Sequence, residues 1–227
     1  MPMARTHISF VSKLSGFDKS YLYSGAIFPD YFSFTKIHLN KHHELFTLLK
    51  NNDGLMFGKR MLKLAKTKEE KAFTIGFISH FILDKHFHNY FDKQKVSTVE
   101  EHLSIESFYD TNFKNIQLKY IIIPKGLLDK TLNKYYSKEI KSKVSYIELI
   151  TFVLYLKTIQ KEIIDNKHTC PKWSYIDLIA PFIYKTPICL KKITAPDFSL
   201  KSKHLNNLKK EFRKSEIELQ KILSKLN

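Results

Sequence analysis

The stretch from Phe73 to Phe91, FTIGFISHFILDKHFHNYF, decides the expected fold. Apolar and aromatic side chains fill most of its positions, so it reads as a buried helix. His80, Asp84 and His88 recur within it at intervals of four residues. Because four residues overshoot one helical turn by only about 40°, these three side chains form one narrow stripe. Gly76 continues the stripe one turn earlier, where the missing side chain would let another backbone approach.

A stripe of two imidazoles and a carboxylate inside so apolar a helix is costly unless it is bound by something. Zinc is the leading candidate, because imidazole nitrogen and carboxylate oxygen are its usual ligands. The alternative is a set of core histidines that donate to carbonyl groups, with Asp84 paired to one of them. Spacing alone does not separate the two interpretations.

A second stripe follows at short range. Residues 97–101, STVEE, fit a capping box and predict that a helix starts near residue 98. On this helix His102, Glu106 and Asp110 repeat the four-residue spacing. Two helices that each carry a stripe of metal-type ligands are a far stronger signal than either one alone.

Composition indicates a folded, helical protein with a basic surface. The chain has 227 residues, 43% of them hydrophobic, with only 6 glycines and 7 prolines, which favours one all-α domain over an all-β fold. A formal charge of +16 favours anionic partners such as nucleic acid, phosphorylated metabolites or acidic lipid headgroups, and does not choose among them.

Targeting and redox signals are sparse. We expect a cytoplasmic location, since neither a secretory signal nor a run of 18 apolar residues is present. The two cysteines, Cys170 and Cys189, are too few for a disulfide framework.

The domain is expected to span residues 1–200, with residues 201–227 forming a C-terminal amphipathic helix packed on the same domain. Gly25 and Pro29 predict a turn within residues 24–34. The stretch 119–124 could be a strand or a buried helix, and a further helix is predicted to start near Pro171. The helix from Thr67 to Phe91 is expected to lie buried between those over 37–50 and 98–112. Further helices are predicted over residues 3–14, 55–66, 146–165 and 203–226. The last of these is expected to carry, on or near one face, Leu205, Leu208, Phe212, Ile217, Leu219 and Leu223.

Five motifs follow one another along residues 6–106, a little under half of the chain. They are Thr6-His7, Pro29-Asp30, a histidine about a dozen residues later, GFISHFILD over residues 76–84 with His88, and HLSIE over residues 102–106. In this order they resemble the zinc-dependent phospholipase C family, whose secreted members include bacterial phosphatidylcholine-hydrolysing enzymes and the clostridial alpha-toxin.

The resemblance implies an all-helical domain with two or three zinc ions in a cleft. The first ion would be held by Asp30, His42 or His43, His80 and Asp84. The second would be held by His88, His102 and Glu106. A third ion in the secreted enzymes uses a histidine matching His7, a carboxylate matching Asp84 and the amino terminus of a mature tryptophan. This chain has no such tryptophan, since its only one is Trp173.

The expected function is therefore a zinc-dependent phosphoesterase that hydrolyses a phospholipid phosphodiester, with Asp30 as the general base toward the attacking water. Bound metal and an open coordination position suit that chemistry. One alternative is a zinc-dependent single-strand nuclease, which the charge of +16 would suit. Another is a non-catalytic helical binding protein stabilised by zinc. The expected partners are a phospholipid or other phosphodiester, an anionic membrane surface, or nucleic acid, with no obligate protein partner.

Overall fold

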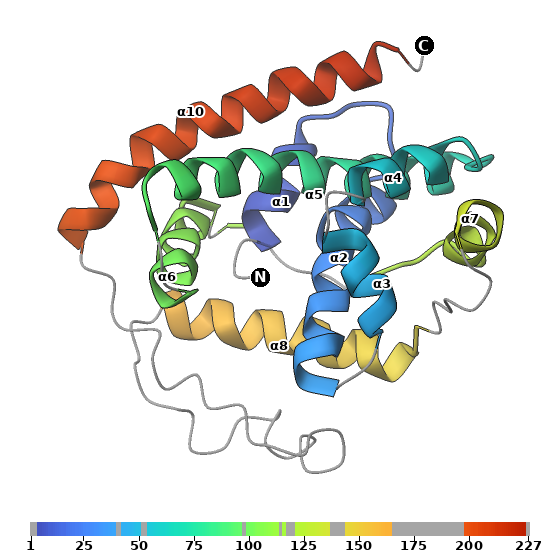
Figure 1. Ribbon diagram of the computed structural model, residues 1–227, viewed down its shortest axis with the longest axis horizontal. Coiled ribbons are helices and arrows are strands. Elements are labelled where there is room, and N and C mark those ends of the chain that lie inside the picture. The colour runs from blue at the N-terminus through green and yellow to red at the C-terminus, as the bar shows by residue number, and fades with distance from the viewer. Residues whose placement is uncertain are drawn as a thin grey trace. The chain divides into compact units, whose positions relative to one another are not determined.

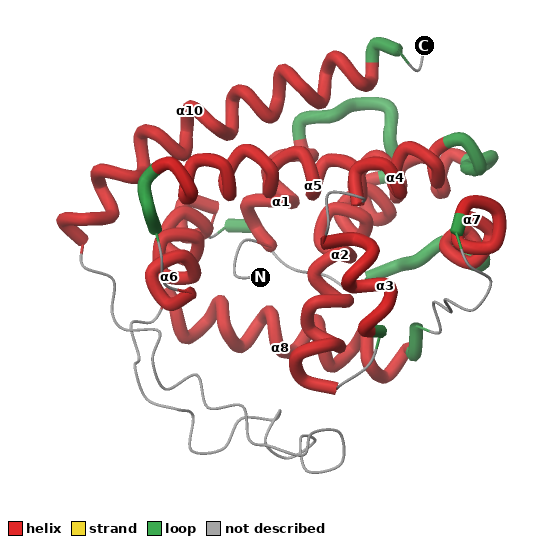
Figure 2. The backbone as a smooth tube through the Cα atoms, viewed as in Figure 1, coloured by secondary structure: helices red, strands yellow, loops and turns green. Residues whose placement is uncertain are grey.

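The protein is helical throughout the part of the chain that the computed structural model describes, which is residues 4–39, 42–50, 54–96, 99–113, 115–116, 121–136, 144–164 and 198–225. Those residues contain helices and loops and no strand (Figure 2). The all-α prediction is confirmed. The predicted helix near Pro171 and both cysteines lie outside the described residues.

Helices succeed one another along the chain and are joined by short loops wherever the connection is described (Figure 1). They are α1 Ala4–Ser12, α2 Lys19–Leu39, α3 His43–Leu48, α4 Gly54–Leu62, α5 Lys68–Lys93, α6 Val99–Asp110 with the 3-10 helix η2 Thr111–Phe113, α7 Leu127–Tyr135, α8 Tyr146–Ile164 and α10 Phe198–Leu223.

The chain forms two compact units. One, called the α2 unit, comprises residues 7–81 and 119–153, and the other, called the α6 unit, comprises residues 1–6, 82–118 and 154–227. The helices α5 and α8 each supply residues to both. The predicted division at residue 200 stays a prediction.

Helix α2 corrects two expectations. The predicted turn at Gly25 and Pro29 is wrong, because α2 runs unbroken through Pro29. A proline inside a helix removes one hydrogen bond and costs about 3 kcal/mol. Burial of Phe28, Tyr31 and Phe34 on this helix, all fully inaccessible to solvent, outweighs that cost.

The helix expected over residues 37–50 is instead two helices. Helix α2 ends at Leu39, and α3 begins at His43 after His42, whose φ of 55° is left-handed and stops a continuous helix. Helix α7, with Leu127, Leu128 and Leu132 buried, was not predicted from the sequence. Residues 121–124, at the end of the ambiguous run, form neither helix nor strand.

Helices α2 and α5 approach each other closely within the α2 unit. A Cβ atom on Gly25 would overlap the carbonyl oxygen of Phe73, and one on Gly76 would overlap the carbonyl oxygen of Leu22. The expectation that Gly76 admits another backbone is confirmed. Because the two glycines face each other's helix, the crossing has no room for any side chain at either position.

A capping box starts α5. The Thr67 hydroxyl accepts a hydrogen bond from the Glu70 N–H at 3.1 Å, and the Glu70 carboxylate accepts from the N–H groups of Lys66 and Thr67 at 2.7 and 3.2 Å. The helix expected to start at Thr67 has its first residue at Lys68. Among the described residues no helix is both long and apolar enough to cross a bilayer.

Replacing Gly76 by alanine should destabilise the protein although alanine is the better helix former. Alanine gains up to about 1 kcal/mol of helix propensity, but overpacking a filled crossing costs about 3 kcal/mol. We expect Gly76→Ala and Gly25→Ala to lower the free energy of unfolding by about 2 kcal/mol, measured by urea denaturation. Gly58→Ala is the comparison variant and should lose less stability, because its Cβ would overlap a side-chain carbon of Ile78 rather than a backbone atom. Unchanged stability of Gly76→Ala would contradict the close crossing.

Candidate metal centre

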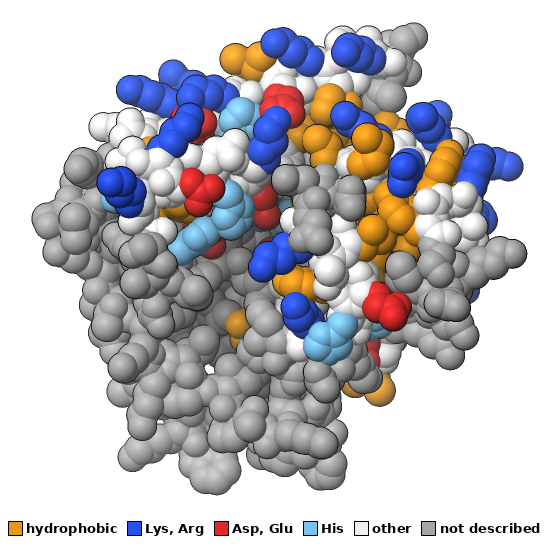
Figure 3. Space-filling model, in the orientation of Figure 1, with side chains coloured by type: hydrophobic (Ala, Val, Ile, Leu, Met, Phe, Trp, Pro, Cys, Tyr) orange, Lys and Arg blue, Asp and Glu red, His pale blue; other side chains and the backbone are white. Residues whose placement is uncertain are grey.

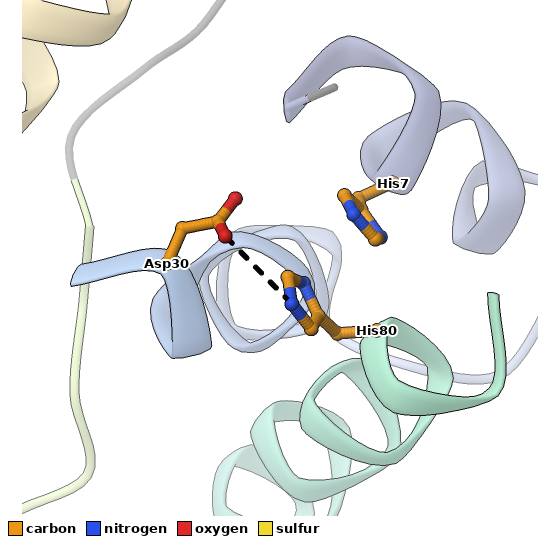
Figure 4. Close-up of side chains that lie close together, drawn as sticks. All are labelled: His7, Asp30 and His80. Atoms are coloured by element: carbon orange, nitrogen blue, oxygen red, sulfur yellow. Dashed lines mark ion pairs between the residues drawn. The ribbon is translucent and has the colours of Figure 1, made fainter. Parts of the chain in front are cut away.

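His7, Asp30 and His80 come together in the α2 unit from three different helices. They lie on α1, α2 and α5, and their side chains point toward one another (Figure 4). One potential ligand atom from each lies within 4.8 Å of the others, and all three residues are at least nine-tenths buried. We call these three residues the buried group.

The close crossing of α2 and α5 also orients His80. Its Nδ1 lies 2.8 Å from the carbonyl oxygen of Ala26. A carbonyl only accepts hydrogen bonds, so Nδ1 carries the proton and Nε2 of the neutral ring presents a lone pair. That Nε2 faces the Oδ1 atom of Asp30 at 3.9 Å (Figure 4). His80 therefore bonds a carbonyl, as the core-histidine interpretation expects, and still offers a ligand atom.

His7 and Asp30, the other two residues of the buried group, are also suited to bind a cation. The His7 ring stacks on the His80 ring, with centroids 4.0 Å apart and planes 17° from parallel, an arrangement that disfavours a positive charge on both. The Oδ2 atom of Asp30 is buried and has no hydrogen-bond donor among the described residues. Leaving a buried carboxylate oxygen without a donor is costly, and a water molecule bound to a metal ion beside it would remove that cost.

Two imidazoles and a carboxylate make a donor set that zinc prefers. Bonds of about 2.1 Å in a tetrahedron place neighbouring ligand atoms about 3.4 Å apart. The 3.9 Å between His80 and Asp30 is close to that value, so small side-chain rotations would complete a site. The buried group therefore fits zinc.

His88, His102 and Glu106 form a second cluster in the α6 unit, called the outer group, and again offer ligand atoms within 4.8 Å of one another. Glu106 is buried, His102 half-buried and His88 exposed. The Nε2 atom of His102 lies 2.8 Å from Oε1 of Glu106, and the rings of His88 and His102 are 4.8 Å apart.

The pKa of the Glu106 carboxyl is lowered although the residue is buried. Burial by itself would raise the pKa of this carboxyl. The charge of the amino terminus and the hydrogen bond with His102 outweigh that effect and hold the pKa below its ordinary value. An anionic carboxylate beside two imidazoles has the charge and the donor atoms for a divalent cation.

The remaining predicted ligands lie in neither group. Asp84 is half-buried on α5, one turn after His80. His42 lies 3.8 Å from Glu148 and its ring lies near those of Tyr31 and Phe32. His43 is exposed at the start of α3. The resemblance assigned His7 to a third ion, whereas the structure places it with Asp30 and His80, and the assignment of ligands to ions stays a prediction.

Sequence reasoning missed Glu148. It is buried on α8, and its carboxylate accepts a hydrogen bond of 2.7 Å from the Tyr31 hydroxyl. Burial and this acidic partner raise the pKa of Tyr31, so the phenol stays protonated. In the sequence Glu148 reads as an ordinary acid in the first turn of a helix, and nothing there signals a contact with the residue after Asp30.

Asp110, the last member of the second stripe, holds the first turn of α1. Its Oδ1 accepts hydrogen bonds from the Thr6 N–H at 2.7 Å and the Thr6 hydroxyl at 2.9 Å. Burial raises the pKa of Asp110 to about 7, although Thr6 and the charge of Arg5 act in the opposite direction. Asp110 thus contacts the residue that precedes His7 rather than a metal-ligand group.

An all-α fold with two groups of imidazole and carboxylate ligands defines a class of helical proteins that carry candidate zinc sites. A family profile described as zinc dependent phospholipase C matches residues 6–170. The chain belongs to the zinc-dependent phospholipase C family, and the resemblance drawn from its motifs is confirmed. No curated protein matches the chain, and no solved structure does.

Asp110→Asn should change how stability depends on pH. A carboxyl whose pKa rises on folding from 3.8 to about 7 binds its proton more tightly in the folded state. Asp110 therefore stabilises the wild type at low pH. Its contribution to the free energy of unfolding falls by up to about 1.4 kcal/mol per pH unit as the pH rises from about 4 to about 7. Asparagine retains the carbonyl oxygen that Thr6 needs but does not titrate.

We therefore expect the stability of the wild type relative to Asp110→Asn to fall across this interval. Urea denaturation at a series of pH values measures it. Asp92→Asn, at an exposed residue, is the matched control for the loss of one acidic side chain. Parallel curves for the wild type and Asp110→Asn would contradict the raised pKa.

Proposed function

We propose that the protein is a zinc-dependent phosphoesterase that hydrolyses the phosphodiester of a phospholipid in the manner of a phospholipase C. The observation that supports this most strongly is the pairing of family membership with two separate groups of imidazole and carboxylate ligands. A purely structural zinc site would need only one such group.

In this proposal His7, Asp30 and His80 hold one ion. His88, His102 and Glu106 hold a second. Zinc, when bound, makes a coordinated water more acidic and draws charge from the phosphoryl oxygens. The Ala26 carbonyl keeps the ligand nitrogen of His80 in place, in the way that a hydrogen-bond partner on the other ring nitrogen commonly does.

Asp30 is proposed as the general base. Its two carboxylate oxygens have different surroundings, because Oδ1 faces His80 while Oδ2 has no donor among the described residues. An oxygen without a donor is able to accept the proton of an attacking water, provided that the substrate places that water within hydrogen-bond distance.

An exposed apolar surface on α8 favours a lipid over a nucleic acid as the substrate. Tyr146, Ile147 and Ile150 are 76%, 64% and 43% exposed. Glu148, in the same turn, faces inward to Tyr31, the residue after Asp30. The exposed apolar side chains and Glu148 thus lie on the same turn of α8, and Glu148 contacts the residue next to the buried group's Asp30 in the chain. An exposed apolar surface can bind acyl chains, whereas nucleic acid offers little apolar surface to contact it.

Zinc content tests the metal assignment. We expect two or three zinc ions per chain by elemental analysis of the purified protein, and about one fewer in His80→Ala. His86→Ala is the matched control, since His86 lies on the same helix but in neither group, and it should retain the wild-type content. A folded protein that takes up no zinc when zinc is offered would overturn the proposal.

Substrate choice is tested on α8. Replacing Ile147 and Ile150 together by serine should lower hydrolysis of phosphatidylcholine vesicles about tenfold or more, because each side chain loses apolar contact with the lipid. Hydrolysis of soluble para-nitrophenyl phosphorylcholine should stay unchanged. Met56→Ser, at another exposed apolar residue of the α2 unit, serves as the control.

Other outcomes select the alternatives. Hydrolysis of single-stranded DNA without hydrolysis of either phosphorylcholine substrate would identify a nuclease, which the charge of +16 also suits. Stoichiometric zinc without hydrolysis of any activated phosphodiester would identify a non-catalytic binding protein.

A further inference from the structure

Helix α10 sorts its charges by face. The basic side chains described on it and just beyond it are all exposed, and the three acids are all half-buried. The basic residues are Lys209, Lys210, Arg213, Lys214, Lys221 and Lys225, and the acids are Glu211, Glu216 and Glu218. A helix that was simply solvated on one side would mix the two signs there.

The acids face the rest of the α6 unit. Glu218 pairs with Lys85 at 3.0 Å and with Nε2 of His86 at 2.9 Å. Glu211 lies 3.5 Å from Nδ1 of His86. Because these carboxylates are turned toward α5, they do little to neutralise the outer side of α10.

Helical geometry gathers the basic residues on that outer side. At about 100° per residue, all six lie within about 80° of Ile217, whereas the acids and the buried Leu208 and Phe212 lie beyond that sector. Ile217 is 58% exposed. The prediction that placed it with the apolar residues of this helix is wrong, because it lies at the centre of the basic side.

We propose that this outer basic face of α10 is a docking surface for membranes rich in acidic phospholipids. Residues 209–225 extend for about 24 Å, long enough to contact several headgroups at once. Lys and Arg side chains follow α10 along the upper edge of the view in Figure 3. Each basic residue near an anionic bilayer strengthens binding about fivefold, so a face with six of them is complementary to such a surface.

Ile217 favours a bilayer over nucleic acid as the occupant. An apolar side chain at the centre of a lysine-rich face can enter the boundary between headgroups and acyl chains. A surface that binds single-stranded nucleic acid usually adds aromatic rings that stack on bases. The described residues of the outer face carry none, since they are lysines, one arginine, Asn206, Ile217, Gln220 and Ser224.

The test is co-sedimentation of the full chain with vesicles on ice. Vesicles of phosphatidylcholine alone are compared with vesicles containing about one third phosphatidylglycerol. The variant replaces Lys210, Arg213 and Lys221 by glutamine. A matched triple variant replaces Lys59, Lys63 and Lys71, which are exposed on other parts of the chain, and changes the net charge equally. Thermal unfolding verifies that both variants fold.

We expect the wild type to bind the anionic vesicles at least tenfold more strongly than the neutral ones. The α10 triple variant should bind the anionic vesicles about ten- to hundredfold more weakly than the wild type, and the matched variant should bind them as the wild type does. Ile217→Ser, made as a single variant, should also weaken binding. Because the readout is sedimentation, the result does not depend on hydrolysis or on zinc content.

Three results would overturn the proposal. The first is an absence of preference for anionic vesicles. The second is an equal loss in the two triple variants, which would trace the binding to net charge alone. The third is wild-type binding to a single-stranded 30-mer DNA that exceeds vesicle binding and is lost only in the α10 variant, which would make the face a nucleic-acid surface.

Discussion

The contact between the backbones of α2 and α5 at Gly25 and Gly76 is the constraint on which the buried group depends. Only at such a short distance does the carbonyl of Ala26 reach Nδ1 of His80 across the helix boundary. The same approach places Asp30, four residues further along α2, opposite Nε2 of His80. A wider crossing, with ordinary side chains at the two glycines, would separate these groups by several ångströms.

Polar groups in the two units are stabilised in different ways. In the outer group, Oε1 of Glu106 lies 2.8 Å from Nε2 of His102, its hydrogen-bond partner. In the buried group, the Oδ2 atom of Asp30 has no hydrogen-bond donor among the described residues and is left for a ligand to satisfy. Residues that are poorly satisfied without a ligand are usual where a protein binds a metal.

Periodicity along the chain was sufficient for the helical class, the α5 and α6 stripes and the role of Gly76, because each depends on local spacing. The turn predicted at Pro29 was wrong, because a rule based on the proline alone does not include the burial of the aromatic residues around it. The contacts of Glu148 with Tyr31 and of Asp110 with Thr6 join residues 117 and 104 positions apart. Ile217 was misplaced because it was grouped with the other apolar residues by hydrophobicity, although at about 100° per residue it lies far around the helix from Leu208 and Phe212.

The hydrogen bonds from Thr6 to Asp110 have a consequence for the order of events during synthesis. His7, Asp30 and His80 have all been made once about a third of the chain has left the ribosome. The carboxylate that holds the residue before His7 comes some thirty residues after His80. A nascent chain therefore contains every member of the buried group before Asp110, the hydrogen-bond partner of Thr6, has been made.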